Sequence, residues 1–143
     1  MAYQNILVPV DGSETSYAAV AQAAELAKAF GGKITVVQVL ALDPYIAAEY
    51  ISATQTNDLI ERARTSVLKT LEEAAAKFSD LGIPVEAKLL EGQVVHREII
   101  KEAETSKADL IVIGSHGRTG LKRLFLGSVA QSVLGEAHIP VLV

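Results

Sequence analysis

Short apolar runs alternate with segments of helical periodicity along this chain, and this alternation constrains its fold more than any other feature. The runs expected to be strands are residues 6–10, 34–40, 83–90, 110–113 and 140–143. The segments expected to be helices are residues 15–30, 57–81, 94–106 and 128–137. Such alternation is typical of right-handed crossovers and a parallel sheet with helices on both faces. We therefore predict a single doubly wound α/β domain over residues 1–143.

The longest helical segment has the clearest pattern. Its apolar residues recur at spacings of four and three, which places them on one helix face that we expect to pack in the core. These residues are Leu59, Ala63, Val67, Leu71, Ala74, Phe78 and Leu81. The preceding residues 41–56 have no clean period, and we interpret them as a loop with room for a short helix. Tyr45 and Tyr50 in this loop could cover a ligand or pack on the surface.

Composition excludes several classes of function. The chain has 143 residues, no cysteine and a formal net charge of −4. The absence of cysteine rules out disulfides, thiolate metal sites and thiol catalysis, and it fits a reducing compartment. The negative charge argues against general nucleic-acid binding. The N-terminus resembles no secretory signal and no run is long enough to span a membrane, so we expect a cytoplasmic protein.

A spaced glycine pattern follows the apolar run 110–113 directly. It reads Gly114-x2-Gly117-x9-Gly127-Ser128. Glycines let backbone N–H groups approach an anion closely, and a helix that begins near Ser128 would point its positive end at the same loop. The pattern therefore predicts a phosphate site, and a nucleotide is the natural ligand.

The position of the site follows from the predicted topology. In an open parallel sheet, ligands bind beyond the carboxyl ends of the strands where the winding direction reverses. Asp11-Gly12 follows the first predicted strand and Gly114 the fourth. If these two strands are neighbours, the five-stranded sheet has the order 3-2-1-4-5 and both loops line one crevice.

Other nucleotide and catalytic motifs are absent from the sequence. The segment from Gly117 to Lys122 has the wrong spacing for a P-loop, and no Gly-x-Gly-x2-Gly fingerprint exists. The three histidines show no metal-ligand spacing, and no Gly-x-Ser-x-Gly elbow marks a hydrolase. We assign no catalytic residue and no protein-bound metal.

The glycine spacing, with Val8-Pro9-Val10-Asp11 near the start and Pro140-Val-Leu-Val at the end, resembles the ATP-binding branch of the universal stress protein family. The resemblance covers essentially the whole chain. It implies a doubly wound α/β fold, an adenine nucleotide as ligand (ATP, or ADP or AMP), and a homodimer joined through the last strand. It also implies that Mg²⁺ would be held by the phosphates.

The resemblance also implies a role for each matching residue. Pro9 and Asp11 would contact the nucleoside, and Val39 and Ile113 would adjoin the adenine. The ribose and phosphates would be wrapped by Gly114, Gly117, Gly127, Ser128 and Val129. Arg118, which follows the second motif glycine, is a candidate phosphate ligand, although it could also belong to a solvated face together with Lys122 and Arg123. His116 is interpreted as a solvent-facing loop residue.

Asp11 has a structural interpretation as well. It could cap the first helix, with Glu14 three residues later completing a capping box. The two roles are compatible.

Three functions remain open from the sequence. The first is a nucleotide-dependent regulatory or stress-response module, favoured because no obvious general base is placed to activate water. The second is a slow Mg²⁺-dependent ATPase or phosphotransferase that uses Arg118 or Lys122 to stabilise charge. The third is a dimeric interaction scaffold without nucleotide, which the intact glycine pattern argues against.

Overall fold

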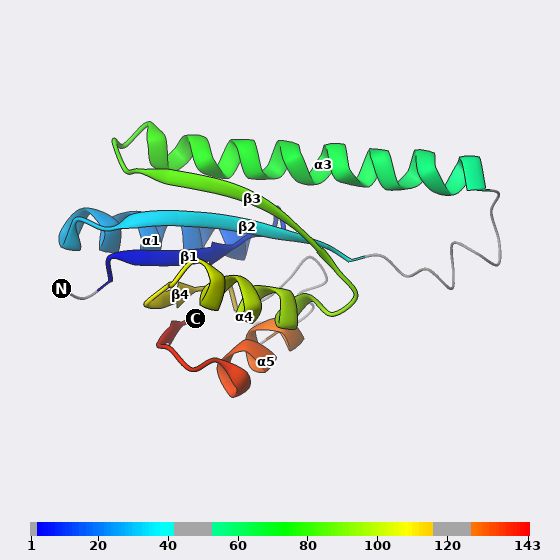
Figure 1. Cartoon of the computed structure of the whole chain (residues 1–143). Coiled ribbons are helices and arrows are strands. Elements are labelled where there is room, and N and C mark those ends of the chain that lie inside the picture. The colour runs from blue at the N-terminus through cyan, green and yellow to red at the C-terminus, as the bar shows by residue number, and fades with distance from the viewer. Residues whose placement is uncertain (1–2, 42–52, 116–126) are drawn as a thin grey trace.

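The computed structural model describes residues 3–41, 53–115 and 127–143. Strands and helices alternate as expected (Figure 1). The strands are β1 (Asn5–Pro9), β2 (Lys33–Ala41), β3 (Val85–Gly92), β4 (Leu110–Val112) and β5 (Val141–Leu142). The helices are α1 (Glu14–Phe30), α3 (Ala53–Ser79), α4 (Val95–Thr105) and α5 (Ser128–Glu136).

The strands form one parallel sheet of order β3-β2-β1-β4-β5, which confirms the predicted topology. β1 pairs on one side with β2, where Ile6 lies opposite Ile34. On its other side β1 pairs with β4, where Ile6 lies opposite Leu110. The chain therefore winds outward from β1 in both directions, and β3 and β5 are the edges of the sheet.

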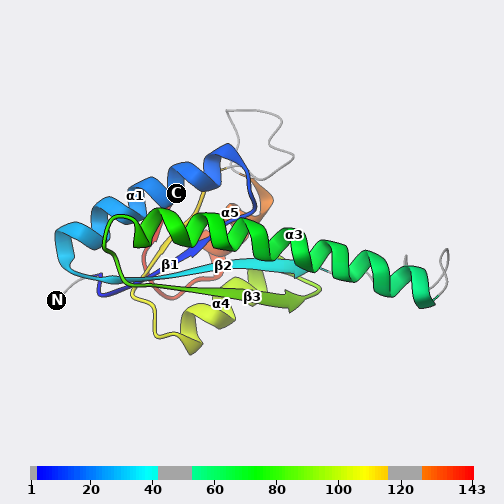
Figure 2. The same cartoon turned by 90° about the horizontal axis from the view of Figure 1, so that it is seen from above.

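The alternation of side chains along each strand divides the core into two layers. Ile6, Val8 and Val36 face α1 and α3, where they pack against a cluster that includes Phe78. Leu7, Val37 and Ile111 point to the opposite face, where α4 and α5 cover them. Figure 2 shows α1 and α3 on one side of the sheet and α4 on the other. Both faces of the central strands are thus buried, as their continuous apolar runs predict.

Several predicted boundaries were wrong by a few residues. α3 begins at Ala53 instead of 57 and ends at Ser79, and β3 runs from Val85 to Gly92 instead of 83–90. β4 ends one residue before Ile113. The predicted loop 41–56 therefore includes the last residue of β2 and the start of α3, whereas residues 42–52, with Tyr45 and Tyr50, lie outside the described residues.

The predicted buried face of α3 is only partly correct. Val67, Leu71, Ala74 and Phe78 are buried, but Leu59 is 51% exposed and Leu81 is 49% exposed. Figures 1 and 2 show that the N-terminal end of α3 projects beyond the ends of the strands, so that no sheet lies beneath it. Leu81 lies past the end of the helix.

None of the helices in the described part of the chain combines the length and the apolarity needed to span a membrane.

Candidate nucleotide site

The carboxyl ends of β1 and β4 lie side by side, which is the geometry that the sequence predicts for the site. Leu7 of β1 is paired with Ile111 of β4, and both strands end two residues or fewer further on. The winding direction reverses between these two strands, because β1 leads outward to β2 and β4 leads outward to β5. This junction is the topological switch point, where open α/β sheets bind their ligands.

The loop after β1 carries a cluster of polar groups at the start of α1. Ser13 is the N-cap: its Oγ accepts a hydrogen bond from the Ser16 N–H at 3.2 Å. The carboxylate of Asp11 accepts a hydrogen bond from the Ser13 N–H at 2.9 Å, which holds the turn before the helix. The prediction that Asp11 caps the helix, with Glu14 in a capping box, was therefore wrong. Asp11 stabilises the turn two residues before the cap.

The hydroxyl groups of this first turn were not among the predicted site residues. Ser13 Oγ and Thr15 Oγ1 lie 3.2 Å apart, and Ser16 Oγ donates to the Ser13 carbonyl at 2.9 Å. The hydroxyl-rich stretch from Ser13 to Ser16 is the signal that could have revealed them. They add donors and acceptors to the same end of the sheet as Asp11.

Gly114 brings the loop after β4 into contact with this turn. A Cβ atom at position 114 would lie 2.7 Å from the carbonyl oxygen of Thr15 and 3.0 Å from the backbone nitrogen of Ser16. A residue larger than glycine would therefore push the loop after β4 away from α1. The loop after β4 thus lies directly against the first turn of the helix that follows β1.

The last glycine of the pattern lies next to the residue that follows its first glycine. The Gly127 N–H donates a hydrogen bond to the Ser115 carbonyl, which places the two ends of segment 115–127 next to each other. Gly127 is also the N-cap of α5 and provides no side-chain cap. The first turn of α5, with Ser128 exposed and Val129 half-buried, therefore begins next to Ser115 and carries N–H groups at the positive end of the helix.

The remaining predicted residues fall into two groups. Pro9 and Ile113 are buried at the ends of β1 and β4, and Val39 near the end of β2 is half-buried and packs with the α4 and α5 layer. Gly117 and Arg118 lie outside the described residues, as do His116, Lys122 and Arg123. Within the described ranges, no group of three or more His, Asp or Glu side chains could hold a metal ion.

A parallel sheet of order β3-β2-β1-β4-β5 with helices on both faces and a switch point between β1 and β4 defines an α/β protein of the doubly wound class. Residues 2–143 match the family model described as the universal stress protein family, and the chain belongs to that family.

Individual relatives agree with this assignment. The chain is 36% identical to the universal stress protein MJ0531 of Methanocaldococcus jannaschii over 142 residues, which span 99% of this chain and 81% of the relative. A universal stress protein in complex with cAMP superposes with a TM-score of 0.74 at 27% identity, covering 99% of this chain and 97% of that one. A universal stress protein from Archaeoglobus fulgidus in complex with dAMP superposes with a TM-score of 0.69 at 28% identity, covering 99% of this chain and 98% of that one.

Proposed function

We propose that this chain binds an adenine nucleotide, with ATP as the expected ligand, in the crevice between the ends of β1 and β4 and acts as a nucleotide-dependent regulatory module of the stress response. The observation that carries the proposal is the contact of Gly114 with the first turn of α1, which joins the two polar loops at the switch point. The cAMP and dAMP complexes of two similar proteins support the adenosine phosphate class of ligand.

The described residues have the chemistry that such a ligand requires. Among them Asp11 engages only the Ser13 N–H, so its carboxylate keeps acceptor capacity for a ribose hydroxyl. Buried Ile113 and half-buried Val39 supply an apolar wall for the base. Pro9 would border the nucleoside. Gly114 would let the loop after β4 stay close to α1 and would thereby keep the crevice narrow at its base.

The phosphates would lie toward the start of α5. Ser128 and Val129 present backbone N–H groups and a hydroxyl there, and Gly127 borders them without a side chain, while Gly117 and Arg118 enter the proposal from the sequence alone. Mg²⁺, when bound with the nucleotide, would neutralise part of the phosphate charge and would be held mainly by the phosphates.

The two motif glycines in the described part of the chain differ in a way that supports a ligand. Gly114 is explained by packing against α1. Gly127 has φ −63° and ψ 155°, which any residue can adopt, so the backbone conformation does not require glycine there. A glycine that the backbone does not need is expected where a ligand approaches the main chain closely.

The decisive experiment is a nucleotide titration of Gly127→Ala, with Gly135→Ala as the matched control on the same helix. Protein stripped of bound nucleotide is titrated with ATP and with ADP, and its unfolding is followed separately. We expect Gly127→Ala to keep its fold and to lose at least about tenfold in affinity, a difference of about 1.4 kcal/mol, while Gly135→Ala binds normally. Equal binding by both variants, or no binding by the wild type, would overturn the proposal.

Incubation of the same protein with ATP tests whether the nucleotide is hydrolysed. A regulatory module should return ATP uncleaved after long incubation with Mg²⁺. Sustained release of ADP or AMP would instead favour the slow ATPase.

We also propose a homodimer that forms through the C-terminal strand. β5 is an edge of the sheet, and Leu142 and Val143 are both about two-fifths exposed there, at 40% and 43%. Pairing of β5 with a second copy would cover these side chains. Leu142→Asp should then shift the protein to a smaller species in analytical ultracentrifugation.

A further inference from the structure

The opposite edge of the sheet is longer and is also unpaired within the described part of the chain. β3 has eight residues, and β2 is its only strand neighbour among the described residues. The Ile34 N–H donates to the Pro84 carbonyl at 2.9 Å, so the backbone groups of even-numbered residues in this region point to β2. Because successive residues alternate, the N–H and C=O groups of Val85, Ala87 and Leu89 point outward.

An apolar groove runs beside this edge. It has a volume of about 460 Å³ and lies between the outer side of α3 and β3. Leu68 at its rim is 50% exposed, and Ala87 and Leu89 form the wall on the strand side. The α3 wall contains the small residues Ala75, Ala76 and Ser79, which leave room for another element. Apolar surface next to unpaired strand groups is a surface for another strand.

We propose that a second copy of this chain pairs its β3 with this edge, antiparallel and about a two-fold axis that passes through Ala87. An antiparallel pair with Ala87 opposite itself makes Ala87 a hydrogen-bonded pair, in agreement with its outward backbone groups. Val85 then lies opposite Leu89 of the second copy, and the reverse pair is equivalent. The pairing would form about six backbone hydrogen bonds.

Charge selects this register over its neighbours. An axis through Glu86 would place two Glu86 side chains opposite each other, and an axis through Lys88 would place two lysines opposite each other; both arrangements are destabilising. With the axis at Ala87, each Glu86 lies opposite Lys88 of the other copy. An axis at Leu89 brings no opposite charges together. The sequence Glu86-Ala87-Lys88 is thus complementary to itself only when Ala87 is central.

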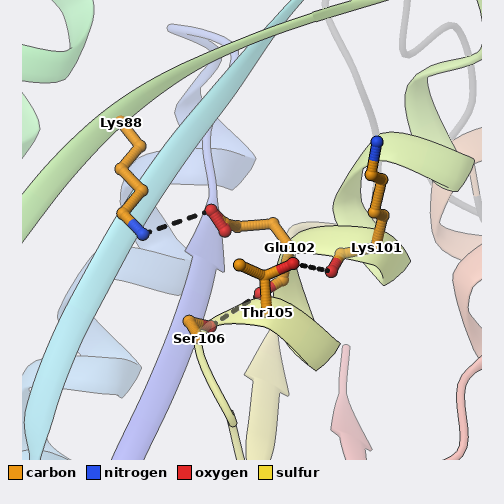
Figure 3. A network of polar contacts seen from close by, with 5 residues as sticks. All are labelled: Lys88, Lys101, Glu102, Thr105 and Ser106. Atoms are coloured by element: carbon orange, nitrogen blue, oxygen red, sulfur yellow. Dashed lines mark hydrogen bonds and ion pairs between the residues drawn. The ribbon is translucent and has the colours of Figure 1, made fainter.

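Lys88, one member of each proposed Glu86–Lys88 pair, is already held in place within a single chain. Lys88 lies on the α4 side of the sheet and forms an ion pair of 3.3 Å with Glu102, as Figure 3 shows. Glu86 projects from the same face of β3, because it lies two positions before Lys88 in the strand. In the pair, Lys88 would bridge Glu102 of its own chain and Glu86 of the second copy. The lysine that would otherwise shield the edge thereby contributes to the contact.

Disulfide trapping tests the register directly, because the chain contains no cysteine. In Ala87→Cys the two cysteines would face each other with Cα atoms about 5.5 Å apart, within the range of a disulfide or a short bifunctional maleimide. Leu89→Cys is the matched control, since in this register its two copies lie about four residues apart along the strands. We expect a covalent dimer from Ala87→Cys only. Absence of that dimer, or equal cross-linking of both variants, would overturn the proposal.

A second pair of variants tests the contact without a cross-link. Ala87→Pro removes an outward N–H that the monomer does not use, so the fold should survive while β3 pairing is lost. Glu86→Lys replaces the complementary charge, and Glu25→Lys on the exposed side of α1 makes the same change in net charge elsewhere. In sedimentation velocity, Ala87→Pro and Glu86→Lys should lose an association step that Glu25→Lys retains. If all these variants sediment like the wild type, β3 does not pair.

Pairing through β3 should depend neither on nucleotide binding nor on pairing of the C-terminal strand. A Leu142→Asp background leaves β3 intact, so Ala87→Cys should still cross-link there. Loss of the cross-link in that background alone would show that the C-terminal contact drives it, and would overturn an independent β3 interface.

Discussion

The Nζ atom of Lys88 on β3 lies 3.3 Å from Oε1 of Glu102 on α4, and the Glu102 side chain is only 8% exposed (Figure 3). The other carboxylate oxygen, Oε2, is buried and has no hydrogen-bond partner within the described structure. Glu102 also sits on the face of α4 that carries the buried residues Ile99 and Ala103. Lys88 is therefore the one described cation that compensates this carboxylate, and the pair ties the edge strand to the helix layer.

Removal of the lysine should destabilise the protein. Lys88→Met leaves a buried carboxylate without its cation, and because the lysine is itself 30% exposed we expect a loss of about 2 kcal/mol, below the range for a fully buried pair. The double variant Lys88→Met/Glu102→Leu should recover most of this loss, since no charge then remains buried. Urea denaturation at low protein concentration measures both. A double variant as unstable as Lys88→Met would contradict the electrostatic explanation.

Gly114 and Gly135 should respond to the same substitution in opposite directions. Gly114→Ala would place a Cβ against the rigid backbone of Thr15, and we expect it to cost about 1–3 kcal/mol, as overpacking does. Gly135 lies in α5, where a Cβ would meet no other atom within 4 Å, so Gly135→Ala should gain about 0.5 kcal/mol from helix propensity. Thermal and urea unfolding would compare them. Equal effects would mean that the contact between the two loops is loose.

The two halves of α3 should differ in their sensitivity to truncation. Leu71 is 2% exposed, and Leu71→Ala should cost about 2–4 kcal/mol by leaving a cavity. Leu59 is 51% exposed, and Leu59→Ala should change the stability by no more than about 0.5 kcal/mol. The comparison uses the same residue type in one helix. A large loss from Leu59→Ala would show that its surface is covered in solution.

The same helix shows what periodicity does and does not reveal. Leu59 and Leu71 both belong to the apolar stripe that the spacing predicts, but they lie at opposite margins of it, about 120° apart around the helix axis. Whether the face is covered depends on the length of the sheet beneath it, and the strands end before the helix does (Figure 1). A sequence pattern defines a direction from the helix axis, whereas burial also needs a partner element at that position.

The topology of the sheet was predictable for a stronger reason. Continuous apolar runs such as Ile34–Leu40 must be covered on both faces, and the polar loops after β1 and β4 favour a shared crevice. These two conditions select the order in which β1 and β4 are neighbours. Finer details at the site were less predictable, because Asp11 and Ser13 are both good capping residues and only the exact start of α1 decides between them. Likewise, the glycine spacing gives no indication that Gly114 packs against α1 or that Gly127 has a backbone conformation open to any residue.

The end of α4 contains a strained residue whose replacement should stabilise the fold. Lys107 has φ 56°, in the left-handed region, and it occupies the position where helices usually place glycine. The backbone around it forms a Schellman motif: the Ala108 N–H donates to the Ala103 carbonyl at 2.9 Å and the Lys107 N–H donates to the Glu104 carbonyl at 3.2 Å. The conformation is therefore imposed by the helix end, and a side chain there only adds strain.

Lys107→Gly should relieve that strain. Glycine also raises the conformational entropy of the unfolded chain, which offsets part of the benefit, so we expect the free energy of unfolding to rise by about 0.5 kcal/mol. Lys101→Gly, the same substitution at an exposed position inside α4, should cost about 1 kcal/mol because glycine is a poor helix former. The opposite signs separate backbone strain from the loss of a positive charge, which the two variants share. The Asn5 side chain donates to the Lys107 carbonyl at 3.2 Å, a contact that glycine retains. If urea denaturation shows both variants destabilised, then the lysine side chain itself stabilises this helix end and the strain is small.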